Sequence, residues 1–349
     1  MSMDENKIFQ AIPASLLLWY RQNKRDLPWR NNPTPYRVWV SEIMLQQTRV
    51  EAVKEYFQRF MQALPTVQDL ANCAEEKLLK LWEGLGYYSR ARNLQKAARQ
   101  IVTEYAEFPN DVDTLKKLAG IGSYTAGAIA SIAFGQRVAA VDGNVFRVAS
   151  RLTENPTVIS SPAYRRYLEN ALASVYPQEG HACAEFTQSL FELGALVCKP
   201  QNPDCKACPL AEICMANRHG TQRNFPVLPV KKAKREEDVY VFLIQTPHGF
   251  CMRRRETGVL KGMNEFPSVI SSGESVATAL RGLGIDEFEQ VCIKPYTHIF
   301  THIRWNITCV WVRTDSAEFD TYTLEEIAES ISLPTAFKQC MSILKEKEI

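Results

Sequence analysis

Long hydrophobic runs are missing from this sequence. No stretch of about 18 consecutive apolar residues, the length that a helix needs to cross a bilayer, occurs in the chain. The first residues also lack the positively charged segment followed by an apolar one that is typical of a secretory signal. We therefore expect a soluble, intracellular protein that does not associate with membranes.

A large excess of charge of either sign is missing as well. The 349 residues include 41 Lys and Arg against 39 Asp and Glu, which gives a formal net charge of +2. Charge alone therefore does not indicate a polyanionic partner, and any field that attracts one must come from the local arrangement of side chains. The length and the hydrophobic content of 46% are sufficient for two domains with their own cores.

Most of the ten cysteines are isolated, and only four of them cluster. In an intracellular protein this distribution argues against a disulfide framework. The cluster has the spacing Cys198-x6-Cys205-x2-Cys208-x5-Cys214 and contains two prolines. Four thiolates at this spacing can close a metal site made of sulfur ligands. By chemistry alone, both zinc and an iron–sulfur cluster are allowed.

A short glycine turn separates two apolar helical segments near the middle of the chain. Gly120-Ile121-Gly122 predicts a tight hairpin, and the N–H groups at the start of the next helix, from Ser123 onward, suit a phosphate. Some twenty residues later, Asp142 is well placed as the N-cap of another helix. Singly, these features are an ordinary corner and an ordinary cap. Together they suggest a nucleic-acid backbone with a carboxylate directed at it.

Residues 118–145 resemble the helix-hairpin-helix and the following catalytic aspartate of the endonuclease III superfamily of DNA glycosylases, in the variant found in adenine DNA glycosylases of the MutY type. Tyr124 stands where the lyase members carry the lysine that forms a Schiff base with the sugar. An amine can perform that chemistry and a phenol cannot. The cysteine spacing matches the [4Fe–4S] loop of the same superfamily, so the resemblance implies this cofactor in a structural role.

Glu42 lies in the segment WVSEIMLQQT, which matches the pattern of this family for the catalytic glutamate and for the wedge that enters the DNA stack. Without the resemblance, a carboxylate among apolar neighbours either turns to solvent or has a function. Cleavage of an N-glycosidic bond has oxocarbenium character, which suits one protonated and one ionised carboxyl. The resemblance implies that Glu42 protonates adenine at N7, favoured by its apolar surroundings, while Asp142 stays anionic at a helix N-terminus and faces the sugar.

The resemblance also implies roles for the other residues that match its motifs. Packing is the alternative for Trp29 and Arg30, which lie in a proline-stiffened loop, and for the lone His302. The implied catalytic residues are Glu42, Asp142, Tyr124 and Asn144; the adenine-binding residues are Trp29, Arg30 and Gln188; the DNA-binding residues are Leu45, Gln46, Gln47, Tyr87, Gly120, Gly122, Phe300, Thr301 and His302; and the cluster ligands are Cys198, Cys205, Cys208 and Cys214.

The expected fold class is α+β and multidomain. An all-α helix-hairpin-helix glycosylase domain with its [4Fe–4S] loop is expected over 1–218, a linker over 219–238, and a Nudix-like α/β domain over 239–349. The basic run in the linker is either a solvated tether or a DNA contact. Periodicity predicts helices at 8–20, 38–60, 70–82, 145–195 and 336–345, and strands at 239–244, 250–253, 299–303 and 307–312.

The sequence departs from the family pattern at two places. Ala119 replaces the usual proline before the hairpin, and Asn264 replaces the usual tryptophan in the entry loop of the Nudix-like part. The Arg-Glu-x-x-Glu-Glu metal signature of Nudix hydrolases does not follow that loop, so hydrolysis of nucleoside diphosphates lacks its carboxylates. In the family, Phe300-Thr301-His302 corresponds to the loop that detects 8-oxoguanine.

The resemblance implies a monomeric, monofunctional enzyme of the bacterial cytoplasm that acts on double-stranded DNA. It would flip out and remove adenine opposite 8-oxoguanine or guanine. A bifunctional lyase of the endonuclease III kind is the nearest alternative, and Tyr124 speaks against it. A non-catalytic iron–sulfur DNA-binding protein is disfavoured because Glu42 and Asp142 are both present in their motifs.

Overall fold

The computed structural model describes residues 3–178, 180–230 and 233–345. The chain divides into two compact units. Unit 1 comprises Met1–Asn72 and Arg92–Val230, and unit 2 comprises Cys73–Ala91 and Lys231–Ile349. A helical segment that we expected inside the first domain therefore groups with the C-terminal residues.

Unit 1 is built from helices. It contains α1 (Met3–Asn23), η1 (Pro28–Arg30), α2 (Pro35–Leu45), α3 (Val50–Ala63), α4 (Val67–Asn72), most of α6 (Ser89–Glu104), α7 (Val112–Leu115), α8 (Ser123–Ile132), α9 (Gly143–Thr153), α10 (Pro162–Val175), α11 (Gly180–Leu196), η2 (Cys205–Ala207), α12 (Met215–His219) and η3 (Gln222–Asn224).

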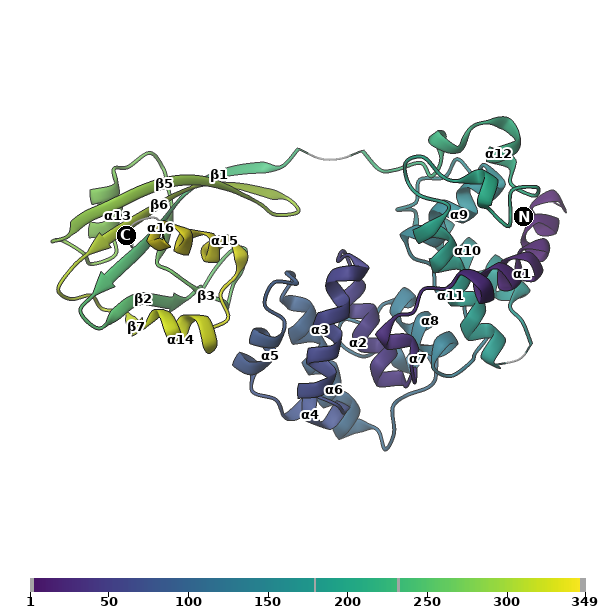
Figure 1. Ribbon diagram of the computed structural model, residues 1–349, viewed down its shortest axis with the longest axis horizontal. Coiled ribbons are helices and arrows are strands. Elements are labelled where there is room, and N and C mark those ends of the chain that lie inside the picture. Colours follow the sequence, from purple (N-terminus) through teal and green to yellow (C-terminus); the bar gives the residue numbers. More distant parts are fainter. Residues whose placement is uncertain (1–2, 179, 231–232, 346–349) are drawn as a thin grey trace. The chain divides into compact units, whose positions relative to one another are not determined.

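Helices α1, α9, α10 and α11 lie together in unit 1 (Figure 1) and share one core. Phe9 and Leu16 of α1 pack with Phe146 of α9 and Phe186 of α11. Three of the four clustered cysteines pack against the edge of this core, so the cysteine loop lies against a core that includes α9, the helix whose N-cap is Asp142. Burial of these apolar faces is what holds the helices in place.

Three of the predicted helices are interrupted. The expected helix 38–60 is α2 and α3, separated by a turn in which Gln47 has a left-handed φ of 55°. The expected run 145–195 is α9, α10 and α11. Glu154, with a left-handed φ of 50°, ends α9, and the Ser161 side chain caps the N-terminus of α10. Similarly, the predicted helix 70–82 is interrupted between α4 and α5 (Glu75–Leu81). Hydrophobic periodicity continues across such breaks because both flanking helices turn an apolar face to one core.

Unit 2 contains α5 and a mixed sheet with helices packed on it (Figure 1). Its other elements are β1 (Arg235–Thr246), β2 (Gly249–Arg254), β3 (Asn264–Glu265), β4 (Ser268–Ile270), α13 (Val276–Arg281), β5 (Glu289–Ile299), β6 (Ile303–Arg313), β7 (Asp320–Tyr322), α14 (Leu324–Glu329), α15 (Thr335–Lys338), η4 (Gln339–Met341) and α16 (Ser342–Lys345).

The main path of the sheet has the order β3-β2-β1-β6-β5. Strands β1 and β6 are parallel, with Arg235 opposite Ile303, whereas β5 and β6 form an antiparallel hairpin. The predicted strand at 299–303 is wrong, because Ile299 ends β5, Ile303 begins β6, and the residues between them form the turn of that hairpin. Strand β1 begins at Arg235, four residues before the expected start of the Nudix-like domain at 239, because it pairs with the start of β6.

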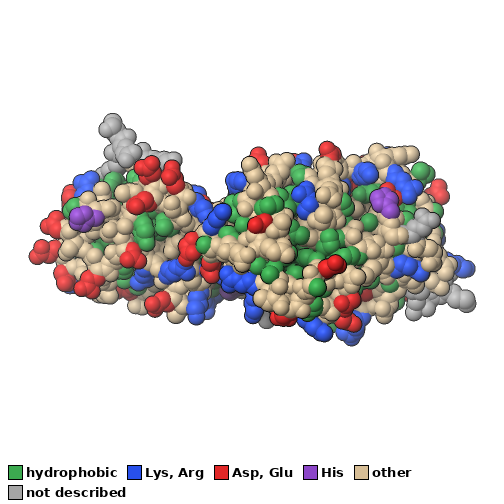
Figure 2. Space-filling view, turned by 90° about the horizontal axis from the view of Figure 1, so that it is seen from below, with side chains coloured by type: hydrophobic (Ala, Val, Ile, Leu, Met, Phe, Trp, Pro, Cys, Tyr) green, Lys and Arg blue, Asp and Glu red, His purple; other side chains and the backbone are tan. Residues whose placement is uncertain are grey.

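Basic and acidic side chains are interspersed over the visible face of the molecule (Figure 2), in keeping with the small net charge. Among the described residues, no helix combines the length and the apolar character needed to cross a membrane.

Candidate active site

A cavity of about 640 Å³ lies in unit 1, where η1, α2, α8, α9 and α11 meet. It brings together ten of the residues singled out in the sequence, from segments far apart in the chain. Its predicted lining residues are Trp29, Arg30, Glu42, Leu45, Gln46, Gln47, Tyr124, Asp142, Asn144 and Gln188.

Glu42 enters this cavity from α2, a helix that begins with Pro35 and is capped by the Thr34 side chain. The carboxyl group is buried, and the Tyr124 hydroxyl donates a hydrogen bond to its Oε2 atom. Burial raises the pKa of Glu42 to about 7, although the bond from Tyr124 acts in the opposite direction. Glu42 can therefore hold a proton near neutral pH.

Asp142 is the N-cap of α9, as predicted. Its Oδ1 accepts the Val145 N–H at 2.8 Å, and its Oδ2 accepts Asn144 Nδ2 at 2.8 Å. Burial nevertheless raises the pKa of Asp142, because the cost of burying the charge exceeds the gain from these hydrogen bonds. The helix start alone suggested the opposite direction. The pKa values of both carboxyls are thus shifted upward, and each is held by a different partner.

Asn144 connects Asp142 to the cysteine loop through Arg147, a residue that the sequence did not single out. Arg147 Nη2 donates to Asn144 Oδ1 at 2.6 Å and to the Gly194 carbonyl at 2.9 Å, while its Nε donates to the Cys198 carbonyl at 2.7 Å. A side chain at Gly194 would meet Asn144, since an added Cβ would lie 2.5 Å from its Cβ. Glycine at 194 thus lets α9 and α11 approach closely.

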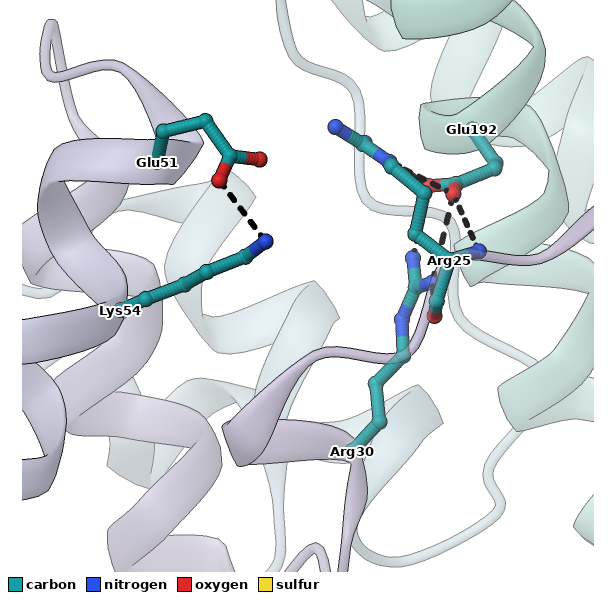
Figure 3. A network of polar contacts seen from close by, with 5 residues as sticks. All are labelled: Arg25, Arg30, Glu51, Lys54 and Glu192. Atoms are coloured by element: carbon teal, nitrogen blue, oxygen red, sulfur yellow. Dashed lines mark hydrogen bonds and ion pairs between the residues drawn. The ribbon is translucent and has the colours of Figure 1, made fainter.

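Glu192 of α11 is a third carboxylate at the cavity, and sequence reasoning missed it. Its side chain is completely buried, and it binds two arginines at 2.8 Å, Arg25 Nε through Oε1 and Arg30 Nη2 through Oε2 (Figure 3). Burial by itself would raise the pKa of Glu192, but the hydrogen bonds from Arg25 and Arg30 lower it to about 2. A carboxylate among the apolar residues at the C-terminal end of α11 was the available signal, as a carboxylate among apolar neighbours was for Glu42.

Both ends of the Arg30 guanidinium therefore have partners: Nη2 donates to Glu192, and Nη1 donates to the Arg25 carbonyl at 2.8 Å. Trp29 packs edge-on against Phe57, with ring centroids 5.7 Å apart, and also lines the cavity. Gln188 donates to the Ala184 carbonyl of its own helix at 3.3 Å. These predicted adenine contacts line the cavity and also contribute to packing.

The glycine hairpin lies in unit 1 outside the lining of the cavity, between α7 and α8. Gly120 has a φ of +75°, and a Cβ there would lie 2.8 Å from Asn93 Cβ. Gly122 is the N-cap of α8 and faces open space, which leaves the first amides of that helix without a side-chain cap. Ala119, where the family usually has proline, donates its N–H to Gln100 Oε1 at 2.9 Å. A proline could not make this bond.

Tyr87, Thr301 and the residues on either side of Thr301 lie in unit 2. Tyr87 is half exposed, has a left-handed φ of 49°, and its hydroxyl lies 3.0 Å from Thr301 Oγ1. Phe300 packs edge-on against the buried Trp305, with centroids 4.8 Å apart, while Thr301 and His302 are exposed at the β5–β6 turn. Two predicted wedge residues, Tyr87 and Gln47, thus share a strained backbone conformation that is common at functional sites.

The four clustered cysteines lie near one another beside α9. The pKa of Cys208 is raised to about 12, chiefly by burial and then by the negative charges of the neighbouring thiolates of Cys198, Cys214 and Cys205. Among the described residues, no three His, Cys, Asp or Glu side chains are gathered closely enough to share one metal ion. In a [4Fe–4S] cluster each thiolate binds its own iron atom, so the thiols must surround a common space rather than one ion. The donor set fits such a group.

Known protein families and solved structures match the two parts of this fold. Residues 40–173 match the family described as HhH-GPD superfamily base excision DNA repair protein, and residues 240–342 match the NUDIX domain. A thermostable thymine-DNA glycosylase of known structure is 26% identical, with a TM-score of 0.56, and the match covers 61% of this chain and 98% of that chain. The structure of an endonuclease III trapped as a covalent intermediate with DNA is 25% identical, with a TM-score of 0.52, and the match covers 62% of this chain and 98% of that chain. Fold and cavity therefore define a protein of the HhH-GPD base excision repair class.

The curated relatives narrow this class. The adenine DNA glycosylase of Arabidopsis thaliana is 38% identical, over 84% of this chain and 56% of its own length. That of Mus musculus is 35% identical over 89% and 72%, and that of Buchnera aphidicola is 32% identical over 85% and 86%. The chain thus spans little more than half of the Arabidopsis relative but most of the other two. It belongs to the adenine DNA glycosylase family.

Proposed function

We propose that this protein removes adenine from double-stranded DNA by hydrolysis of the N-glycosidic bond, where the adenine lies opposite 8-oxoguanine or guanine. The observation that carries this proposal is the convergence of Glu42 and Asp142 on one cavity in unit 1. Family membership supports the same substrate. We expect the protein to act as a monomer on genomic DNA in the bacterial cytoplasm.

Glu42 is the proposed general acid. Adenine is a poor leaving group unless it is protonated, and a carboxyl with a pKa of about 7 carries the required proton near neutral pH. Tyr124 donates to Oε2 of Glu42, so the proton for adenine N7 would be carried on the other oxygen, Oε1. As a phenol, Tyr124 forms no Schiff base, which makes the enzyme monofunctional.

Asp142 is the proposed electrostatic partner of the sugar. In its ionised form, the carboxylate stabilises the positive charge that develops on the sugar as the bond to adenine breaks. Asn144 and the Val145 N–H each donate to one carboxylate oxygen and fix its orientation. The rotamer of Asn144 is in turn held by Arg147.

The target base lies inside a duplex and must be extruded, at a cost of roughly a few kcal/mol. Leu45, Gln46, Gln47 and Tyr87 are the proposed wedges, and the amides after Gly122 would hold a phosphate. We further propose that Phe300, Thr301 and His302 read the lesion opposite, and that Trp29, Arg30 and Gln188 contact the adenine. Cys198, Cys205, Cys208 and Cys214 would hold a [4Fe–4S] cluster, which ties the loop at four points when bound.

Single-turnover release of adenine from an adenine:8-oxoguanine duplex tests this function. Glu42→Gln and Asp142→Asn should each lower the rate by several orders of magnitude, whereas Glu51→Gln, an exposed carboxylate of α3, serves as the matched control and should leave it unchanged. Wild-type rates in either cavity variant would refute the assignment. Borohydride trapping on abasic DNA separates this enzyme from a lyase, since only an amine nucleophile gives a trapped complex.

A further inference from the structure

Arg165 of α10 lines the same cavity and has no role in the proposed chemistry. Its Nη1 donates to the Val141 carbonyl at 2.6 Å, and its guanidinium lies over the Phe146 ring, 4.9 Å from the centroid. Val141 directly precedes Asp142. The cation is therefore fixed beside the residue that faces the sugar, and it is only half buried.

The cations at this cavity differ in their partners. Arg25 and Arg30 are both bound to the carboxylate of Glu192. Arg165 is held by a carbonyl and an aromatic ring, and among the described residues no carboxylate neutralises it. An arginine that is oriented in advance but not paired with an acid is suited to bind an anionic ligand.

The net charge of the cavity lining also favours an anionic ligand. Its charged residues are Arg25, Arg30, Arg165, Glu42, Asp142 and Glu192. With Glu42 protonated and Asp142 ionised, as the proposed reaction requires, three cations face two anions. One positive charge remains, which matches the single negative charge of a phosphodiester.

We infer that Arg165 binds a phosphodiester group adjoining the extruded nucleotide, and that this inference rests on the proposed glycosylase function. The hairpin at Gly120 and Gly122 grips the backbone elsewhere, with amides rather than with a charge. Arg165 would add a charge-assisted contact at the cavity itself and hold the sugar next to Asp142. Because Val141 and Phe146 already fix the guanidinium, little conformational entropy is lost when the phosphate binds.

A purely structural role for Arg165 predicts different behaviour. If it only braces the Val141 carbonyl, its removal should shift Asp142 and slow the reaction, without changing how binding depends on salt or on any one phosphate. A phosphate contact predicts that binding itself weakens, and that the loss is tied to one position on the DNA backbone.

The experiment measures binding to a duplex with an uncleavable 2′-fluoro adenosine opposite 8-oxoguanine, with a neutral methylphosphonate placed at each phosphate around the adenosine in turn. Arg165→Gln should weaken binding to unmodified DNA by about 10- to 100-fold, the range for hydrogen bonds to charged groups, and reduce the salt slope by about 1. At one position, the methylphosphonate should weaken binding by the wild type as much as Arg165→Gln weakens binding to unmodified DNA. At that position it should not weaken binding by the Arg165→Gln variant any further. Arg165→Lys should recover part of the affinity, and Arg166→Gln, on the exposed side of α10, is the matched control.

The inference would be overturned if, at every position, the affinity lost through the methylphosphonate added to the affinity lost through Arg165→Gln. It would also be overturned if Arg165→Gln bound DNA as tightly as the wild type. Circular dichroism checks the fold of Arg165→Gln, and Arg165→Lys, tested by the same scan, keeps the inference open to refutation if the glutamine variant does not fold. Adenine release by the wild-type protein is measured in parallel. If the wild type releases no adenine, the proposed function fails; if it releases adenine and the losses are additive, only the role of Arg165 fails.

Discussion

Burial and hydrogen bonding act in opposite directions on Glu42. Burial favours the neutral carboxyl, whereas the Tyr124 hydroxyl favours the carboxylate, and burial dominates. Since the acid must give a proton to adenine, this balance sets the pH range in which the enzyme can work. An exposed glutamate would be almost entirely ionised at neutral pH.

The rate of adenine release should fall as the pH rises through about 7, because Glu42 then loses the proton that the reaction needs. Single-turnover rates over a pH series measure this fall, which is the alkaline limb of the pH–rate profile. Tyr124→Phe removes the bond that favours the carboxylate and should move the limb to higher pH. A limb at the same pH in Tyr124→Phe and in the wild type would contradict the assignment of the titration to Glu42.

Ion pairs contribute differently to the free energy of unfolding when they are buried, as at Glu192, and when they are exposed, as at Glu51. Glu192→Gln would leave Arg25 and Arg30 without their anion and should lower the free energy of unfolding at neutral pH by about 3 to 5 kcal/mol. Glu51→Gln breaks an exposed pair with Lys54 and should cost about 0 to 1 kcal/mol. Urea denaturation compares the two, and Figure 3 shows both pairs.

The pH dependence of that difference has a defined sign. The pKa of Glu192 is about 2 in the folded protein and near 4.5 in the unfolded chain, so the stabilisation is complete above pH 4.5 and is lost as the pH falls toward 2. The difference between the wild type and Glu192→Gln should therefore shrink over this interval. A difference that is independent of pH would show that packing, not charge, makes the contribution.

At the scale of elements, local signals in the sequence predicted more than long-range ones. Asp142 could be recognised as a helix cap because a cap depends on its neighbours in the chain. The left-handed turn at Gln47 and most of β5 were not predicted. Strand β5 is defined by its pairing with β6, in which Glu289 lies opposite Arg313, and hydrophobic alternation within one strand does not reveal such a pairing. The pairing of Glu192 with Arg25 also joins residues 167 positions apart, which periodicity cannot reveal.

The start of β1 holds the turn that carries the proposed lesion-reading residues. Lys234 Nζ donates to the Phe300 carbonyl at 2.7 Å, and the Arg235 N–H donates to the His302 carbonyl at 3.1 Å. The basic run was expected to be a tether or a DNA contact. These bonds place Lys234 and Arg235 of the basic run within unit 2, whereas its other members, Lys231 and Lys232, lie outside the described residues.

Lys234→Met should therefore loosen the turn and lower the preference for 8-oxoguanine over guanine by about 2- to 10-fold, the effect of one hydrogen bond. Rates on both duplexes measure the preference, and Lys234→Arg, which can still donate, should restore it. A uniform loss of affinity on both duplexes, together with a smaller salt dependence, would instead show that Lys234 contacts phosphate.

At the scale of the whole molecule, the cysteine loop and α9 form one assembly around the proposed cluster. Cys208→Ser should abolish bound iron and sulfide and weaken DNA binding, because the loop loses an anchor beside α9. Cys73→Ser changes an isolated buried cysteine and should keep both. Metal analysis of the purified proteins provides the measurement. Zinc in place of iron in the wild type, or an unchanged iron content in Cys208→Ser, would contradict the cluster.

The division of labour between the two units gives the last prediction. Chemistry is proposed for the cavity of unit 1 and lesion reading for Thr301 and His302 of unit 2, so their variants should affect different quantities. Thr301→Val with His302→Leu should slow adenine release opposite 8-oxoguanine by about 5- to 150-fold, because two hydrogen bonds of about 0.5 to 1.5 kcal/mol each are lost. Release opposite guanine should change little, because the hydroxyl and imidazole would read the altered edge of the lesion, and guanine does not carry that alteration. Thr297→Val, an exposed threonine of β5, is the matched control. Equal losses opposite both bases would show that the turn serves binding in general rather than recognition of the lesion.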